Sequence, residues 1–478
     1  MQSTKTEKVI LPVYSNLLSA ESKVDRIPLL SRIYVWSIIL EPLLFFVLFE
    51  RSTMGVTGNL SRILQLVVLI GLTLSFLAAF LNSRPAGVRL PNFASPLYIY
   101  YGIYFSITIV AGFIGFLSGA YNLPVAYDNN KSGFAQWLNS AEFRPIFEYI
   151  TALYYFIYFI VLPKYLLKTE KSLEYYFSVF RKLFITSFIV GAIDLGFAIF
   201  GVGLVPRHFA DGVMVGPRFH GLAGEPRDAF VYLFFGLAML HLHAHYKGLA
   251  LNKGWVVAIT VAATLTQSVS GLLGIVFFLS LYSVYSLGKS SIRQIFRICI
   301  ALTLITLTLY VITVNSERTM LYLASTSNLW ITLETGGEIP YPISVQMGNV
   351  YPLYDLTVKF FNFNILPILI GSGLGSASVI NNIYNTYTTV GMNNPNSQLV
   401  RLVFESGVIG TGFFIMSFTH PIRRLTKHLP TIKKHEFMLL MLLSLGCLFG
   451  HRSTMIFIYL GVFIATSRVL DHRAGLSH

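Results

Sequence analysis

Long runs of apolar residues, separated by short polar breaks, recur along most of the chain. They predict membrane-spanning helices at 33–50, 62–81, 97–118, 146–166, 183–203, 228–246, 255–268, 270–287, 296–314, 398–418, 437–450 and 454–468. Most of these runs have the roughly 17 to 25 residues that a helix needs to cross the hydrocarbon core of a bilayer. We therefore expect an all-α polytopic membrane protein with about twelve transmembrane helices.

Two of the longest apolar stretches are each divided into a pair of helices. The cuts lie at the polar breaks 268–271 and 451–454. Without its cut, the first stretch would have about 33 residues, which is more than a bilayer requires.

The composition supports a membrane protein. Hydrophobic residues make up 54% of the chain and charged residues 12%, whereas about a quarter of the residues in a soluble domain are charged. The first residues, MQSTKTEKVI, lack the apolar core and the cleavage site of a signal peptide. We expect residues 1–32 to form a cytoplasmic tail.

The distribution of Lys and Arg predicts the orientation of the helices. With the N-terminus inside, about two thirds of the 35 Lys and Arg residues lie on the inner side, as positive loops do in membrane proteins. The C-terminal tail, 469–478, is then also cytoplasmic. The net charge of +14 is explained by inner loops that face anionic lipid, so it does not indicate a nucleic-acid partner.

This topology divides the chain at its long outer segments. The first nine helices occupy 33–314 and include the outer loop 204–227, the large outer loop is 315–397, and the last three helices occupy 398–468. The large loop has about 80 residues, far more than a usual helix connection. Because it is rich in aromatic and β-branched residues, we expect a folded cap on the outer surface, in which 365–372 is too short to span the membrane.

Six arginines lie at the outer face, against the trend that keeps positive charge inside. The guanidinium group suits phosphate, so these arginines indicate binding of a lipid phosphate or diphosphate. The alternative is that they pair with Glu225, Asp228, Glu405 or lipid head groups and only hold the loops in place. The six residues are Arg207, Arg218, Arg227, Arg318, Arg401 and Arg452.

Four motifs in this order resemble the O-antigen polymerase and O-antigen ligase superfamily. They are RFHGLAGEP (218–226), TQSVSGLLG (266–274), GSGLG (371–375) and NSQLVRLVFESGVIGTG (396–412), and the resemblance covers roughly 200–470. It implies a bacterial inner-membrane glycosyltransferase of the GT-C type that acts on the periplasmic side without metal or other cofactor. Its donor and acceptor would be undecaprenyl-diphosphate-linked glycans, and its protein partners a flippase and a chain-length regulator.

One departure from the family pattern separates its branches. The ligase branch carries histidine and asparagine where this chain has Asn396 and Ser397. An amide cannot act as a general base. We therefore prefer a Wzy-type polymerase, which joins repeat units, to a ligase. A ligase that transfers glycan to lipid A core is the first alternative, and a transporter of lipid-linked glycan is a further one.

The expected chemistry assigns roles to the outer residues. Arg218 and Arg401 would stabilise the leaving diphosphate, and Arg401 lies one helical turn before Glu405, so the two share a face. Glu225 is the expected proton acceptor, with His220 as the alternative base. The expected substrate-binding residues are Arg207, His220, Arg227, Arg318, Asn396, Glu405 and Arg452. The sequence has no Asp-x-Asp pair, in agreement with a metal-independent enzyme.

A few polar residues inside the apolar runs allow two readings each. Asp194 and Glu41 lie within predicted spans, where carboxylates are costly and often functional; Glu41 precedes Pro42 and would satisfy backbone groups freed by a kink. His241 and His245 lie one turn apart, and an interfacial polar cluster is preferred there over a metal site. Cys299 and Cys447 are predicted to be buried thiols.

Overall fold

The computed structural model describes residues 27–43, 47–49, 58–81, 95–117, 143–205, 218–224, 226–249, 252–266, 365–376, 398–426 and 454–473. Most of these residues are helical, and the strands among them are β1 (Val47–Phe49) and β2 (Gly58–Asn59), a short antiparallel pair. The helices are α2 (Leu29–Leu40), α4 (Leu60–Leu81), α5 (Pro96–Leu117), α7 (Phe143–Tyr155), α8 (Pro163–Leu166), α9 (Glu170–Ile199), α10 (Pro226–Tyr246), α11 (Lys253–Leu265), α16 (Ile365–Ile370), α18 (Gln398–Thr426) and α20 (Met455–Arg473). A π-helical segment (Phe156–Val161) joins α7 to α8, and a 3-10 turn (Gly221–Ala223) precedes α10.

The prediction of a helical multi-pass membrane protein is confirmed in this part of the chain. Seven of the described helical segments are long and apolar enough to cross a membrane, and α2 and α11 are shorter apolar helices at two further predicted spans. The predicted spans 270–287, 296–314 and 437–450 lie outside the described residues, so the number twelve stays a prediction.

Two predicted boundaries are wrong. The first helix does not run from 33 to 50 but ends at Leu40, and β1 follows. Pro42, which lacks a backbone N–H, stands directly after this end. The helix expected at 183–203 begins at Glu170, because Thr169 and Ser172 form a capping box in which Thr169 Oγ1 accepts from the Ser172 amide at 3.1 Å.

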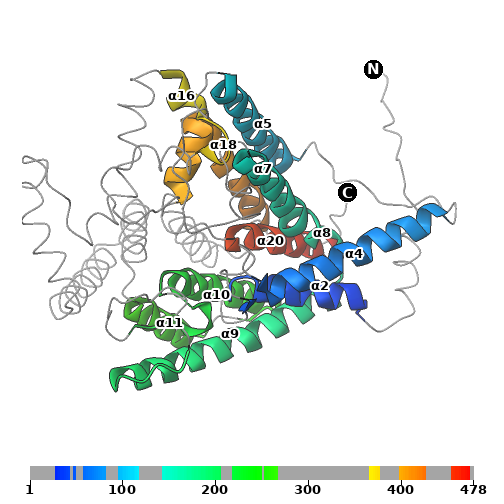
Figure 1. Ribbon diagram of the computed structural model, residues 1–478. Helices are drawn as coiled ribbons and strands as arrows, with labels where there is room; N and C mark the ends of the chain where they lie inside the picture. Colours follow the sequence, from blue (N-terminus) through cyan, green and yellow to red (C-terminus); the bar gives the residue numbers. More distant parts are fainter. Residues whose placement is uncertain are drawn as a thin grey trace, which may run out of the picture.

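Two groups of helices meet along α20. In Figure 1, α5, α7, α16 and α18 lie on one side of α20, and α2, α4, α9, α10 and α11 lie on the other. A close approach is at Gly461 of α20, where an added Cβ would lie 1.9 Å from the Phe159 carbonyl oxygen of the π-helical segment. Tyr459, two residues before, packs edge-on against Phe235 of α10. Glycine at 461 thus allows α20 to join both groups.

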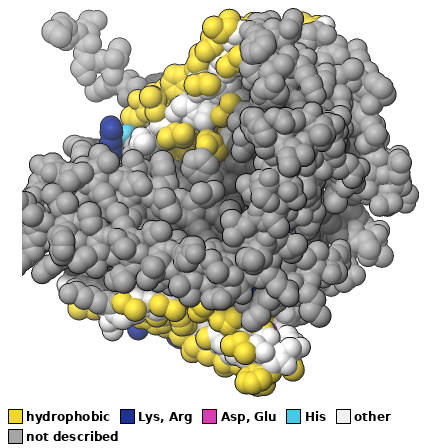
Figure 2. Space-filling view, turned by 90° about the vertical axis from the view of Figure 1, so that its left-hand side faces the viewer, with side chains coloured by type: hydrophobic (Ala, Val, Ile, Leu, Met, Phe, Trp, Pro, Cys, Tyr) yellow, Lys and Arg dark blue, Asp and Glu magenta, His cyan; other side chains and the backbone are white. Residues whose placement is uncertain are grey.

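The outward faces of the bundle carry large apolar side chains. Phe113, Phe116 and Leu77 are among those that are largely exposed. In the view of Figure 2, the described side chains on the surface are mostly hydrophobic. Exposed apolar side chains in such number fit a surface that lies in the acyl chains of a bilayer.

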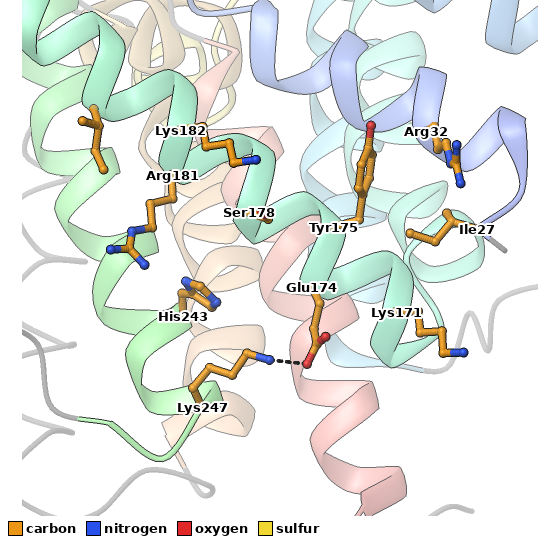
Figure 3. Close-up of a pocket in the computed structure, with 11 residues that line it drawn as sticks. Ile27, Arg32, Lys171, Glu174, Tyr175, Ser178, Arg181, Lys182, His243 and Lys247 are labelled. Carbon is orange, nitrogen blue, oxygen red and sulfur yellow. Dashed lines mark hydrogen bonds and ion pairs between the residues drawn. The ribbon is translucent and has the colours of Figure 1, made fainter. Parts of the chain in front are cut away.

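Ion pairs between helices gather where the sequence predicts the inner ends of the spans. Lys247, after α10, pairs with Glu174 of α9 (Figure 3), and Arg473 of α20 pairs with Glu170. Arg424 of α18 pairs with Asp471 of α20 at 2.6 Å. The helices therefore alternate in the direction that the predicted topology requires, while the assignment of this side to the cytoplasm stays a prediction.

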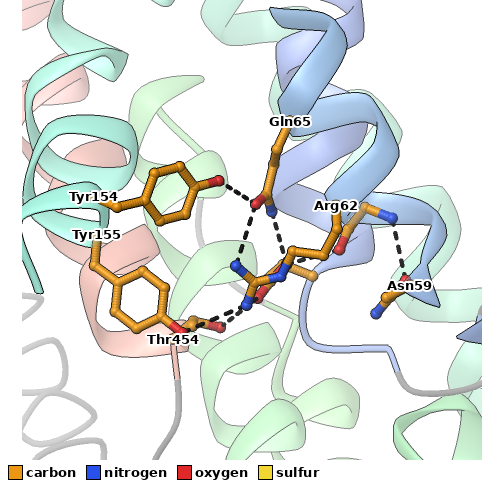
Figure 4. A network of polar contacts seen from close by, with 8 residues as sticks. Asn59, Arg62, Gln65, Tyr154, Tyr155 and Thr454 are labelled. Atoms are coloured by element: carbon orange, nitrogen blue, oxygen red, sulfur yellow. Dashed lines mark hydrogen bonds and ion pairs between the residues drawn. The ribbon is translucent and has the colours of Figure 1, made fainter. Parts of the chain in front are cut away.

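A second network joins helix ends that the topology places outside. Glu41, after α2, pairs with Arg62 of α4 at 2.6 Å and accepts from Ser61 and Gln65 at 2.7 Å each (Figure 4). Thr454, before α20, donates to the same carboxylate at 3.4 Å. We expected Glu41 to bind backbone groups freed by a kink at Pro42. The hydrogen bonds found for its carboxylate come instead from side chains of neighbouring segments.

Candidate functional site

Helix α18 is interrupted at Gly407, whose φ of 64° and ψ of −175° are not helical. An interruption frees backbone carbonyls, and these need donors when they are buried. The loop after α16 supplies them: the Ser372 amide donates to the Phe404 carbonyl and the Gly373 amide donates to the Glu405 carbonyl, both at 2.9 Å. Ser372 Oγ donates to Phe404 as well, at 3.0 Å. The loop therefore completes the backbone hydrogen bonding of the broken helix.

Glycine is required on both sides of this contact. A Cβ on Gly407 would lie 2.2 Å from the Leu369 carbonyl oxygen, and Gly371 has a φ of 80°. The expectation that 365–372 cannot span a membrane agrees with the six-residue helix α16. The segment after α16 was expected to belong to a cap on the outer surface. Instead, Gly371, Ser372 and Gly373 are buried against α18.

Arg401 lies at the centre of a buried charge cluster in α18, two turns before the break. Its Nε donates to Glu405 Oε1 at 2.9 Å, which confirms the predicted pairing on one helix face. Its Nη2 lies 3.0 Å from Oε1 of Glu148, on α7, as an ion pair that lacks good hydrogen-bond alignment. The Gly375 amide also donates to Glu405 Oε1, at 2.8 Å. The three charged side chains are at most 5% exposed.

The cluster contains two carboxylates for one guanidinium. Arg401 is therefore compensated by Glu148 and Glu405, and its charge is less available to a phosphate than the sequence suggests. One turn earlier, the side-chain oxygen of Gln398 is buried and makes no hydrogen bond among the described residues. A buried polar atom without a partner needs an explanation, and a bound polar group is one.

A second cluster is built by the segment 218–224, which packs on α9 and α11. Arg218 Nε donates to the Thr266 carbonyl at 3.0 Å, and the Phe219 amide donates to the Leu265 carbonyl at 3.0 Å. Both carbonyls belong to the C-terminal end of α11, where a cation and extra donors are favourable. The Leu222 amide donates to Ser187 Oγ of α9 at 3.1 Å. The motif is thus folded into the helix bundle and is not a free outer loop.

His220 of this segment forms a fully buried pair with Asp194 of α9. His220 Nε2 lies 2.9 Å from Asp194 Oδ2, and Nδ1 faces the Gly221 carbonyl at 3.2 Å. The other carboxylate oxygen, Oδ1, accepts from the amides of Leu204 and Val205 at 2.7 and 2.8 Å. Since both ring nitrogens of His220 already face oxygen atoms, this geometry favours a positioning role over the role of base. Asp194 thus ties the segment 218–224 to the chain at Leu204 and Val205.

The predicted site residues thus divide into two clusters and an undescribed group. Arg218 and His220 belong to the cluster on α9, and Arg401 and Glu405 belong to the cluster on α18. Arg227 is the second residue of α10, and its side chain is outside the described part. Arg207, Glu225, Arg318, Asn396 and Arg452 lie outside the described residues.

Glu148 is the site residue that sequence reasoning missed. It is a single carboxylate in the apolar stretch FRPIFEYITALYY of α7, and it is 3% exposed. A carboxylate in such a stretch is itself a signal, because ionisable residues in membrane helices are costly. The partner could not be read from the sequence, since Arg401 follows on a distant helix.

The comparisons with known proteins give no independent evidence for the family resemblance, and the expected independence of metal stays a prediction. The described residues contain no group of three or more His, Cys, Asp and Glu side chains that could hold a metal ion. No protein-family model matches the chain, and no curated protein matches it.

Proposed function

We propose that the protein is an inner-membrane glycosyltransferase that polymerises undecaprenyl-diphosphate-linked oligosaccharide repeat units on the periplasmic face, with twelve helices in a GT-C-like arrangement. The observation that carries the proposal is the buried Arg401–Glu148–Glu405 cluster beside the break in α18. Non-helical backbone at membrane depth occurs where it is buried in protein or lines a cavity, and ionisable residues at that depth are usually functional.

The reaction forms one bond and breaks one. The hydroxyl oxygen of the acceptor glycan bonds to C1 of the donor sugar, the bond from C1 to the diphosphate oxygen breaks, and undecaprenyl diphosphate leaves. The hydroxyl proton passes to a carboxylate, for which Glu148 and Glu405 are candidates beside the predicted acceptor Glu225, while His220 is not kept as a base. Arg401 holds these two carboxylates, and Gln398 would orient a sugar hydroxyl.

The diphosphate would be held by the remaining outer arginines. Arg218 contributes positive charge from a buried position at the end of α11. Preorganised cations of this kind stabilise a leaving diphosphate most in the transition state, where its charge develops. Arg207, Glu225, Arg227, Arg318, Asn396 and Arg452 keep their predicted roles in the proposal.

The test is a reconstitution with purified protein. Given only undecaprenyl-diphosphate-linked repeat units, without metal or nucleotide, the protein should make a ladder of lipid-linked oligomers. Glu148→Gln and Glu405→Gln keep the side-chain shape and should lower the turnover number at least about 100-fold, the usual contribution of a positioned acid or base. Asp471→Asn, at the opposite helix ends, is the matched control and should leave the ladder unchanged.

Other outcomes assign other functions. Product formed only after addition of lipid A core would make the protein a ligase. A full ladder with both glutamine variants would show that the cluster on α18 is not the active site.

Transport of a lipid-linked glycan is the second candidate, and the presence of a break in α18 favours it. Discontinuous membrane helices form the substrate sites of many secondary transporters. A transporter would move the lipid-linked glycan between the leaflets of a liposome and leave its length unchanged, which the same purified protein can show.

A further inference from the structure

A cavity of about 690 Å³ lies between α2, α9 and α10, at the helix ends that carry the pair of Lys247 with Glu174. Figure 3 shows its lining side chains on α9 and α10, with Arg32 contributed by α2. Its charged lining residues are Arg32, Lys171, Arg181, Lys182, Lys247 and one carboxylate, Glu174.

The cavity is strongly cationic. Five of its side chains are positively charged, and the single carboxylate is already paired with Lys247. Within the described part of the chain, no carboxylate lies at ion-pair distance from Arg32, Arg181 or Lys182. Positive side chains held around one space repel one another, so an anion in that space would be stabilising.

An apolar groove of about 480 Å³ adjoins the cavity. The two share Arg32 and Tyr175 in their walls. Trp36 lines the groove and donates through Nε1 to the Tyr175 hydroxyl at 3.2 Å, so this aromatic pair stands at the junction. Trp and Tyr prefer such a boundary between hydrocarbon and polar head groups. The remaining wall of the groove is aliphatic and includes Ile33 and Leu183.

We propose that the cavity and the groove together bind one membrane lipid with an anionic, phosphate-bearing head group. The phosphate lies among Arg181, Lys182 and Arg32, and an acyl chain lies in the groove along α2 and α4. Guanidinium groups bind phosphate oxygens with two parallel hydrogen bonds, and basic pockets between membrane helices take lipid head groups of this type. A water-soluble anion would occupy the cavity but leave the apolar groove empty. The proposal does not depend on the reaction proposed above.

The experiment measures lipid binding to the full-length protein in non-ionic detergent. Dioleoyl phosphatidylglycerol, dioleoyl phosphatidylcholine and inorganic phosphate are titrated separately, and bound ligand is counted by native mass spectrometry. The variant Arg181→Gln with Lys182→Gln should weaken phosphatidylglycerol binding about 30-fold, because each such cation contributes about a factor of five toward an anionic lipid.

Two further variants separate the possible ligands. Ile33→Trp fills the groove and should weaken binding of phosphatidylglycerol but not of inorganic phosphate. Arg423→Gln removes an exposed cation of α18 that does not line the cavity, and it should change nothing. Equal binding of both phospholipids, or an equal effect of Arg423→Gln, would overturn the proposal. Unchanged phosphatidylglycerol binding by Ile33→Trp, with competition by inorganic phosphate, would replace it with a site for a soluble anion.

Discussion

The backbone of Gly371 lies directly against the backbone at Gly407, so that a Cβ on Gly371 would approach the Gly407 amide nitrogen to 2.5 Å. This contact holds the loop after α16 in the break of α18. It brings the Gly375 amide within hydrogen-bonding distance of Glu405 Oε1. The charge cluster and the helix break are therefore one structural unit, and changes at the glycines should reach Arg401.

Alanine at Gly371 or Gly407 should destabilise the protein by at least about 2 kcal/mol, because it combines an unfavourable positive φ with a backbone clash. Gly412→Ala is the matched control in the same helix, since nothing lies within 4 Å of the added Cβ. That variant should be neutral or more stable by about 0.5–1 kcal/mol. The measurement is thermal unfolding in detergent followed by size-exclusion chromatography. Equal unfolding temperatures for Gly371→Ala and Gly412→Ala would contradict the proposed contact.

Removal of the Arg401 guanidinium should cost far more than removal of an exposed one. Arg401→Ala leaves Glu148 and Glu405 buried without their cation, which should cost about 3–5 kcal/mol. Arg424→Ala breaks the pair with Asp471. Because the Arg424 side chain is 55% exposed, this change should cost about 1 kcal/mol or less. Adding Glu148→Gln and Glu405→Gln to Arg401→Ala should restore part of the loss, as measured by thermal unfolding. No recovery would show that charge compensation is not the main role of Arg401.

The two oxygens of Asp194 should be separable by substitution. Asp194→Asn can keep the acceptor for the Leu204 and Val205 amides, while Asp194→Ala loses both this acceptor and the pair with His220. We expect the asparagine variant to lose about 1–3 kcal/mol of stability and the alanine variant more. The change His220→Gln should add little to Asp194→Ala. Full additivity of the two losses would argue against the pair.

The predicted orientation can be tested with single cysteines in a background in which Cys299 and Cys447 are alanine. Gly203 and Leu249 are both exposed and follow opposite ends of the bundle. In intact spheroplasts, a membrane-impermeant maleimide should label Gly203→Cys at once and Leu249→Cys only after lysis, because the topology places Gly203 outside. The reverse pattern would invert the topology and move the cationic cavity to the outer leaflet.

Local features of the chain were predictable because they depend on residues close in sequence. Apolar runs of bilayer length predict the helices, and a spacing of four residues predicts that Arg401 meets Glu405. The capping box at Thr169 was also readable in principle, although the span prediction began later. Pro42 marked the end of the first helix, where the apolar run continued and misled the prediction.

Only the tertiary structure decided which distant segments meet. Glu148 reaches Arg401, and the loop after α16 reaches the break at Gly407, because α5, α7, α16 and α18 pack side by side. In the same way, the sequence showed positive charge near the inner helix ends, but only the packing of α2, α9 and α10 gathered it around one cavity. Such pairings depend on shape and on buried hydrogen bonds between elements far apart in the chain, and membrane helices are too alike in hydrophobicity for composition to specify their neighbours.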